Sequence, residues 1–136
     1  AVSKIVKPYT VIEKCGHRIG IFGLTANVTG LVSANVTEGA IYLDPVESAK
    51  YAIGKLKEEK CDVIICLSHL GFDTDKPTSD AMCDTLLAKH FTQDDITLII
   101  GGHTHVRLDE PVYVNEIPIV QSGRKGVFVG EVKIDF

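Results

Sequence analysis

Two stretches of the chain carry most of the information about its fold: DVIICLSHL at 62–70 and ITLIIGGHTH at 96–105. Each carries an apolar run of the length of a β-strand, at 62–67 after the leading Asp62 and at 96–100 with Thr97 within it. A continuous run, in place of an alternating one, is typical of a strand that is covered on both faces of a sheet. The pattern predicts two buried strands, each of which ends at a turn that contains histidine.

A helix is predicted between the first strands and this pair. Asp44 is suited to cap it, Pro45 to take its first position, and Glu47 to complete a capping box. The apolar residues that follow recur at helical spacing and define one buried face: Val46, Ala49, Ile53 and Leu56.

The remaining segments complete an α/β pattern. Strands are predicted at 9–14 and 18–22, a long loop at 26–43, and a second helix at 79–91 with Met82, Leu86 and Leu87 inward. Segments 111–114, 117–121 and 127–134 are nearly alternating and predict an antiparallel meander. Buried strands that alternate with helices imply parallel pairing, and the meander makes the sheet mixed.

Composition limits the class of protein. The chain has 136 residues, of which 45% are hydrophobic and 24% charged, which suits one globular domain. A net charge of −4 argues against binding to nucleic-acid polymers. No stretch reaches the roughly 20 apolar residues of a membrane span. No signal peptide is visible, so we expect that one was removed or that the chain begins inside a longer protein.

Three of the five histidines follow the two buried strands. His69 comes directly after the first run, and His103 and His105 come after the second run and Gly101-Gly102. Ligands of open α/β sheets bind outside the carboxyl ends of the strands, so neighbouring parallel strands would direct the three imidazoles into one site. Three imidazoles suit zinc, manganese or iron. The sequence therefore predicts a metal site at His69, His103 and His105.

Other polar residues have a plainer interpretation. His17 lies in a turn and His90 near a helix end, and we expect structural roles for both. Asp73 and Asp75 could be ligands, but a solvated loop is the preferred interpretation. Arg124 and Lys125 follow Gln121-Ser122-Gly123, where backbone N–H groups and cations could meet a phosphate; a charged hairpin turn is the simpler expectation. The four cysteines show no metal-site spacing and are expected to be free thiols, Cys66 above all.

The two histidine motifs also resemble those of a known family. LSHLG at 67–71, followed by IIGGHTH at 99–105, resembles the last two motifs of the calcineurin-like metallophosphoesterases. Within them the chain most resembles the 5′-nucleotidase / 2′,3′-cyclic phosphodiesterase / UDP-sugar hydrolase family. Segments 9–14 and 19–25 are similar to mid-domain strands of that family, and 119–123 and 129–130 to its closing strands. The resemblance covers nearly the whole chain.

The resemblance implies a fold and an activity. The family has a four-layer α-β-β-α sandwich with two divalent metals and hydrolyses phosphate esters of nucleotides by means of a metal-bound hydroxide. Carried over to this chain, His69 and His103 would bind one metal and His105 the other. Zinc or manganese is favoured, and magnesium, cobalt or iron is compatible. Family habit implies a periplasmic or secreted location.

The chain departs from the family pattern in one respect. The earlier motifs D-x-H, G-D-x-x-[DQ] and G-N-H-[DE] do not occur in it. Three neutral imidazoles cannot compensate the charge of two dications, so anionic ligands are also needed. We therefore expect residues 1–136 to be the C-terminal half of a metallophosphatase domain: half of the sandwich, with a mixed sheet and helices on one face. Its partners would be the missing N-terminal half and a nucleotide or other phosphoester substrate. Little turnover is expected of the chain alone.

Two alternatives stay open. The chain could form its own mononuclear zinc site from the three histidines, with one open position. It could instead be a non-catalytic α/β module that docks on a partner through an exposed sheet edge.

Overall fold

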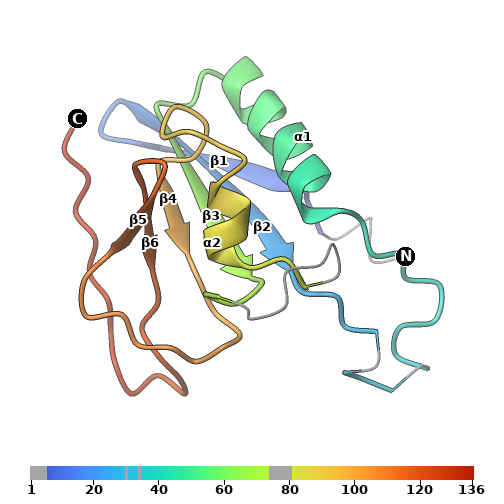
Figure 1. The fold of residues 1–136 in the computed structure, drawn as a ribbon. Helices are drawn as coiled ribbons and strands as arrows, with labels where there is room; N and C mark the ends of the chain where they lie inside the picture. Colours follow the sequence, from blue (N-terminus) through green and yellow to red (C-terminus); the bar gives the residue numbers. More distant parts are fainter. Residues whose placement is uncertain (1–5, 30, 34, 74–80) are drawn as a thin grey trace.

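The structure of the chain is a computed structural model that describes residues 6–29, 31–33, 35–73 and 81–136 (Figure 1). The predicted alternation of strands and helices is confirmed up to residue 120, with a shorter second helix, and no strand follows in the described residues. In chain order the elements are β1 (Tyr9–Lys14), β2 (His17–Thr25), α1 (Pro45–Glu58), β3 (Val63–His69), α2 (Asp84–Ala88), β4 (Leu98–Ile100), β5 (Val112–Val114) and β6 (Ile117–Val120).

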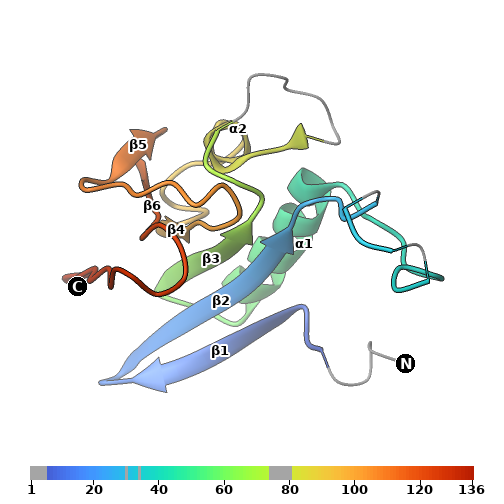
Figure 2. The ribbon, with the colours of Figure 1, turned by 90° about the horizontal axis from the view of Figure 1, so that it is seen from below.

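The strands form one mixed sheet in the order β1-β2-β3-β4-β6-β5. Figure 2 shows β1, β2 and β3 side by side in this sheet. The four inner strands are parallel neighbours, and the edge strands β1 and β5 pair antiparallel with β2 and β6. The register of β3 with β4 places Ile65 beside Leu98 and Leu67 beside Ile100. The carboxyl ends of β3 and β4, where the histidine motifs begin, therefore lie side by side.

One face of the sheet holds the core. Phe22, Cys66, Ile99 and Ile119 form a row across four strands, and each is almost fully buried. Helix α1 packs on the same face: a Cβ built on Gly20 of β2 would lie 2.8 Å from the Leu56 side chain. The missing side chain of Gly20 leaves room for Leu56 of this helix. Because α2 contributes to the same core cluster, the prediction of helices on one face is confirmed.

The opposite face of the sheet is open. Leu67 and Ile100, which are paired in register on β3 and β4, are 47% and 39% exposed. Ile12 of β1 is 47% exposed as well. Side chains alternate along a strand, so His69 lies on the same face as Leu67. An apolar surface of this kind is typical of a face that another layer covers.

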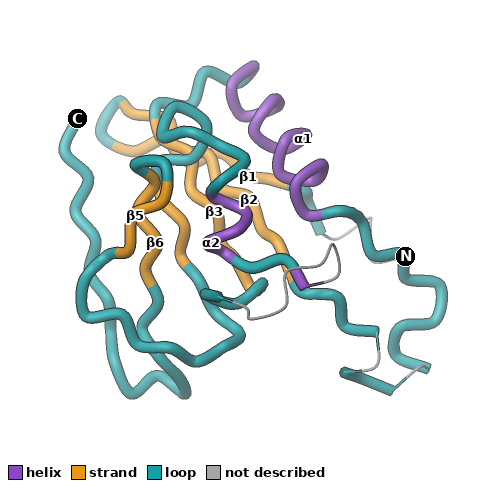
Figure 3. Tube along the Cα trace, in the orientation of Figure 1, coloured by secondary structure: helices purple, strands orange, loops and turns teal. Residues whose placement is uncertain are grey.

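The C-terminal segment crosses part of the open face without joining the sheet. The strand predicted at 127–134 does not form, and Figure 3 shows this region as loop. A cavity of about 690 Å³ separates the segment from β4 and β6, and Val129 is 96% exposed. A strand needs a neighbour for its backbone hydrogen bonds, and no strand in the described part of the chain pairs with this segment. The prediction was wrong because alternation predicts the conformation but not the presence of a partner.

Helix α1 starts as predicted. The Asp44 carboxylate accepts a hydrogen bond of 2.9 Å from the Glu47 backbone N–H, and Pro45 takes the first helical position. The four apolar residues expected to face inward are all buried.

Helix α2 is shorter than the predicted 79–91. Its described part begins at Asp84, because Cys83 is extended and the N–H of Asp84 donates to the Gly71 carbonyl at 2.7 Å. It ends at Ala88, and the next backbone N–H groups donate to carbonyls three residues earlier in place of four. The Asn115 side chain donates to the carbonyls of Ala88, Lys89 and Phe91. The spacing of apolar residues does not predict these ends of the helix, because they depend on contacts with residues distant in the sequence. Leu87 is buried as predicted, and residues 79 and 80 lie outside the described residues.

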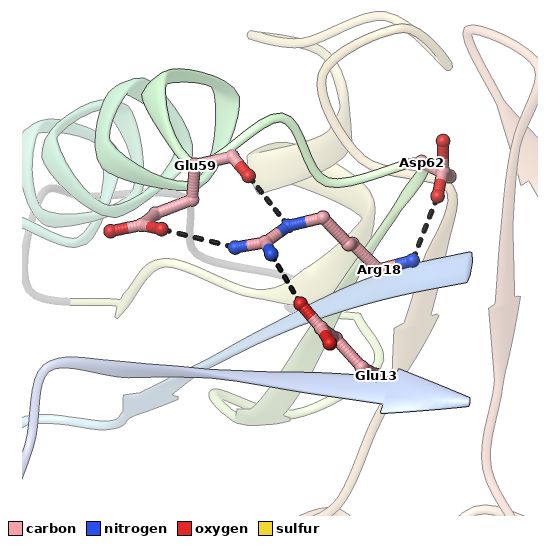
Figure 4. Close-up of polar contacts among 4 residues, drawn as sticks. All are labelled: Glu13, Arg18, Glu59 and Asp62. Atoms are coloured by element: carbon pink, nitrogen blue, oxygen red, sulfur yellow. Dashed lines mark hydrogen bonds and ion pairs between the residues drawn. The ribbon is translucent and has the colours of Figure 1, made fainter. Parts of the chain in front are cut away.

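A charged cluster holds the opposite end of the sheet (Figure 4). Arg18 of β2 donates from Nε to the Glu59 carbonyl at 2.8 Å and from Nη2 to the Glu59 carboxylate at 3.1 Å. It also pairs with Glu13, and its backbone N–H donates to Asp62 at 2.7 Å. The Arg18 cluster thus joins the β1–β2 hairpin to the end of α1 and the start of β3.

The cysteines agree with the prediction of free thiols. All four cysteines are free, with Cys66 and Cys83 buried. Among the described residues, no helix has both the length and the apolarity to cross a membrane.

Candidate metal centre

The three predicted ligands lie at one edge of the sheet. His69 is the last residue of β3, and His103 and His105 lie in the loop that follows β4. All three side chains are exposed. The position is the carboxyl end of two adjacent parallel strands, where ligands of α/β sheets bind.

Two of these histidines are in contact range of one another. The rings of His69 and His103 have centroids 5.1 Å apart and cross at 72°. A Cβ built on Gly102 would lie 3.0 Å from His69 Nδ1, so a side chain at that position would press on the imidazole. Gly102 therefore allows the loop after β4 to pass close to the ring of His69.

The loop that carries His103 and His105 is irregular. Both residues have a left-handed backbone, with φ values of 73° and 58°. Residues other than glycine adopt this region at an energetic cost, which the surroundings must offset. Hydrogen bonds supply part of that support: the Thr104 N–H donates to the Gly102 carbonyl at 2.9 Å, and the Thr104 hydroxyl accepts from the Phe72 N–H at 3.0 Å. The last bond ties this loop to the one after His69.

The histidines alone do not form a complete metal site. In the described part of the chain, no group of three or more His, Cys, Asp or Glu side chains is placed to hold a metal ion. His69 and His103 are in ring contact, and His105 does not join them in a group of three. Two neutral imidazoles leave the charge of a dication uncompensated, so further ligands are required.

Behind the histidines lie polar side chains that sequence reasoning missed. Asp84 is fully buried, and the Ser68 hydroxyl donates to its Oδ1. Burial raises the pKa of Asp84 to about 6, and the bond from Ser68 offsets part of this rise. The signal was present in the sequence: Asp84 stands three residues before Leu87, on the apolar face of the predicted helix.

The sequence predicts for Gln121 only a place in a turn that could bind an anion. Its side chain is instead buried, and in the amide orientation that satisfies its partners its oxygen accepts from the backbone N–H of His105 at 3.0 Å and of Val106 at 2.9 Å. Gln121 therefore fixes the backbone of the loop that carries His105 by hydrogen bonds. Arg124 and Lys125 are exposed in the turn beyond it, which agrees with the simpler expectation of a charged turn.

The other polar candidates take structural or surface positions. His17 stacks on Phe136, with centroids 3.7 Å apart, and its Nδ1 lies 3.8 Å from an Asp62 oxygen. His90 is exposed just beyond α2. Asp73 accepts a hydrogen bond of 3.3 Å from the Thr85 hydroxyl, and residue 75 lies outside the described residues.

Comparison of the chain with solved structures shows the class of fold to which it belongs. The calcineurin-like phosphoesterase YfkN from Bacillus subtilis superposes with a TM-score of 0.71 at 28% identity, over 85% of this chain and 41% of that one. The 5′-nucleotidase precursor from Thermus thermophilus superposes with a TM-score of 0.67 at 29% identity, over 88% and 25%. The chain thus has the α/β fold of calcineurin-like phosphoesterases.

The sequence of the chain is similar to those of enzymes that act on nucleotides. The chain is 33% identical over 125 residues to the 5′-nucleotidase of Vibrio vulnificus, covering 90% of this chain and 22% of the relative. It is 33% identical over 135 residues to the trifunctional nucleotide phosphoesterase protein YfkN of B. subtilis, covering 96% and 8%. No family model matches. The chain is therefore homologous to a segment of the 5′-nucleotidases and nucleotide phosphoesterases, which confirms the resemblance predicted from its motifs. It spans less than a quarter of the length of either relative.

Proposed function

We propose that this chain supplies part of the dinuclear metal centre of a hydrolase that cleaves phosphate esters of nucleotides, of the 5′-nucleotidase or cyclic phosphodiesterase type. The observation that carries the proposal is the approach of His69 and His103, 5.1 Å apart at the ends of two adjacent parallel strands. Homology to 5′-nucleotidases supports the choice of nucleotide phosphoesters as substrates.

The proposed roles follow the family resemblance. His69 and His103 would hold one divalent cation and His105 the other, with zinc or manganese favoured. When bound, two such cations activate water and neutralise the phosphoryl oxygens. The chain's own contribution is to hold the imidazoles: Gly102 lets the His103 loop approach His69, and Phe72 and Thr104 tie the two loops together.

We also propose that residues 1–136 are the C-terminal part of a metallophosphoesterase domain, completed by a second sheet from outside this chain. Two features support this. The open face exposes Leu67 and Ile100, and the segment at 127–134 has strand-forming residues that pair with no strand in the described part of the chain. His69 lies on that same face, so a layer that covers it would also reach the metal site and could bring the anionic ligands that the histidines lack.

The decisive experiment is a chimera. The matching segment of the V. vulnificus 5′-nucleotidase is replaced by this chain, and phosphate release from AMP is measured with added zinc or manganese. We expect a folded chimera to hydrolyse AMP, and His69→Ala, His103→Ala or His105→Ala to reduce the rate by at least 100-fold. His17→Ala and His90→Ala are the matched controls and should retain the rate. A folded chimera in which the three site variants behave like the controls would contradict the proposal.

A second candidate function is favoured by the open apolar face: a non-catalytic module that docks on a partner protein. Sedimentation and metal analysis of the purified 136-residue chain separate the two. Self-association without retained metal, together with an inactive folded chimera, would favour docking. Metal-dependent turnover by the chain alone would contradict the half-domain and favour a mononuclear site. That alternative has less support, because His105 is not grouped with the other two histidines among the described residues.

We propose a periplasmic or secreted location for the whole protein, on the family resemblance. The T. thermophilus structure is named as a precursor, which is consistent with processing in that relative. Fractionation of cells that produce the full-length protein tests this proposal.

A further inference from the structure

Buried polar groups are confined to one place in the fold. Among the described residues, the polar or charged side chains that are buried are Ser68, Asp84 and Gln121. Ser68 and Gln121 lie at the carboxyl ends of β3 and β6, and Asp84, the first residue of α2, packs against Gly101 just after β4. A buried polar group costs free energy unless its hydrogen bonds are satisfied, so their clustering here calls for a reason.

Asp84 is bound to the segment that carries His69. Its Oδ1 accepts from the Ser68 hydroxyl, and the Ser68 oxygen in turn accepts from the Leu70 N–H at 3.2 Å. The backbone N–H of Asp84 donates to the Gly71 carbonyl at 2.7 Å. Asp84 is thus hydrogen-bonded to Ser68, just before His69, through its side chain and to Gly71, just after it, through its backbone.

The second oxygen of Asp84 faces the segment that carries His103. A Cβ built on Gly101, two residues before His103, would lie 2.4 Å from Asp84 Oδ2 and 3.3 Å from the Gln121 side-chain amide. Oδ2 has no hydrogen-bond partner among the described residues. Asp84 therefore fills the space between the two histidine-bearing segments, in contact with one and packed against the other.

We propose that Asp84 is a positioning residue that sets the separation of His69 and His103. The carboxylate spans from Ser68 to Gly101 and fixes the ends of β3 and β4 relative to one another. The consequence for metal binding rests on the proposed function, whereas the effect on the two imidazoles does not.

Burial of Asp84 costs free energy. No ion pair offsets this cost in the described part of the chain, and burial raises the pKa of the carboxyl group. A neutral side chain of the same size avoids the cost. Asparagine keeps the size and one acceptor for Ser68, so Asp84→Asn should keep the histidine geometry, whereas Asp84→Ala should lose it.

The test is NMR spectroscopy of the 136-residue chain without metal. In the native chain we expect a nuclear Overhauser contact between the His69 and His103 rings. Asp84→Ala should weaken it at least twofold and shift both ring resonances, and Asp84→Asn should restore it. Asp95→Ala is the matched control, since Asp95 is also hydrogen-bonded but lies away from the histidines, beside Thr92 and Lys57. Native ring contacts in folded Asp84→Ala would overturn the proposal.

Ser68→Ala provides a second route if Asp84→Ala does not fold. It removes the link to Asp84 with little change in volume, and unchanged ring contacts in this variant would also overturn the proposal. Zinc chloride is then titrated into each chain, and the midpoint for the ring shifts should rise at least threefold in the impaired variants. A native chain whose His69 and His103 ignore zinc would count against the ligand roles and leave the positioning result intact. An equal zinc midpoint in all folded variants would overturn the effect of Asp84 on metal binding.

Discussion

The two ends of β3 hold polar groups in opposite ways. At its start, Asp62 belongs to the Arg18 cluster, in which charged groups lie at the surface and pair with one another (Figure 4). At its end, Ser68 joins a buried carboxylate, Asp84, whose second oxygen has no partner among the described residues. Solvent screens the first arrangement, so it stabilises the fold modestly. The second arrangement costs stability and packs between the two histidine-bearing segments, so the polar groups at the two ends of one strand differ in what they contribute.

The largest effect is expected at the histidine end, from Gln121→Leu. Leucine keeps the volume but leaves the N–H groups of His105 and Val106 without their acceptor. Two unpaired N–H groups should lower the free energy of unfolding by about 4 kcal/mol. Urea unfolding measures this, with the exposed Gln93→Leu as control. A loss of less than about 1 kcal/mol would show that water replaces the amide.

The next largest effect is the dependence of stability on pH at Asp84. Its pKa is about 6 in the folded chain because of burial, against an ordinary value of 3.8, so the folded state binds more protons between these values. Stability from this group is present below pH 3.8 and is lost as pH rises through 6, by roughly 3 kcal/mol. Asp84→Asn should remove this loss and be more stable than the native chain above pH 7.

The matched control for that experiment has the opposite sign. The hydrogen bond from Lys57 holds the pKa of Asp95 below its usual range. Asp95 therefore contributes stability above pH 4 that is lost as pH falls, and Asp95→Asn should be less stable than the native chain at neutral pH. Thermal unfolding between pH 3.5 and 8 follows both variants. Parallel curves for Asp84→Asn and the native chain would mean that Asp84 does not titrate in this window.

A smaller effect is expected at the other end, from Arg18→Ala. The side chain is partly exposed and contacts Glu13 and Glu59. We expect a loss of about 1 kcal/mol at low salt, falling to about half in 1 M sodium chloride. Arg18→Lys should lie between, because lysine cannot form the same forked contacts. A loss that ignores salt would point to packing of the arginine stem in place of charge.

The smallest effect is expected on the exposed side of α1. Lys50 pairs with Glu47 at 2.8 Å, and both side chains are largely exposed. Lys50→Ala should change the free energy of unfolding by about 0.3 kcal/mol or less. A larger change, measured by the same urea unfolding, would break the comparison, since a solvated pair would then equal the Arg18 cluster.

Most of the fold could be predicted from local pattern. The runs at 62–67 and 96–100 are neighbouring parallel strands, and the Asp44-Pro45 start of α1 forms as its residues require. The prediction of a strand at 127–134 was wrong, because a strand forms only beside a neighbour and alternation alone does not supply one. The length of α2 was set by Cys83 and Asn115, whose roles arise from contacts distant in the sequence.

The candidate site divides along the same line. The sequence by itself determined that His69, His103 and His105 lie at the carboxyl ends of two strands, because each of them follows a strand-forming run along the chain. Only the tertiary structure decided that His69 and His103 approach one another, that His105 does not join their group, and that Asp84 lies beneath them. Those outcomes depend on a left-handed loop and on the burial of a carboxylate. Neither is a property of local sequence, because both are settled by which segments pack together.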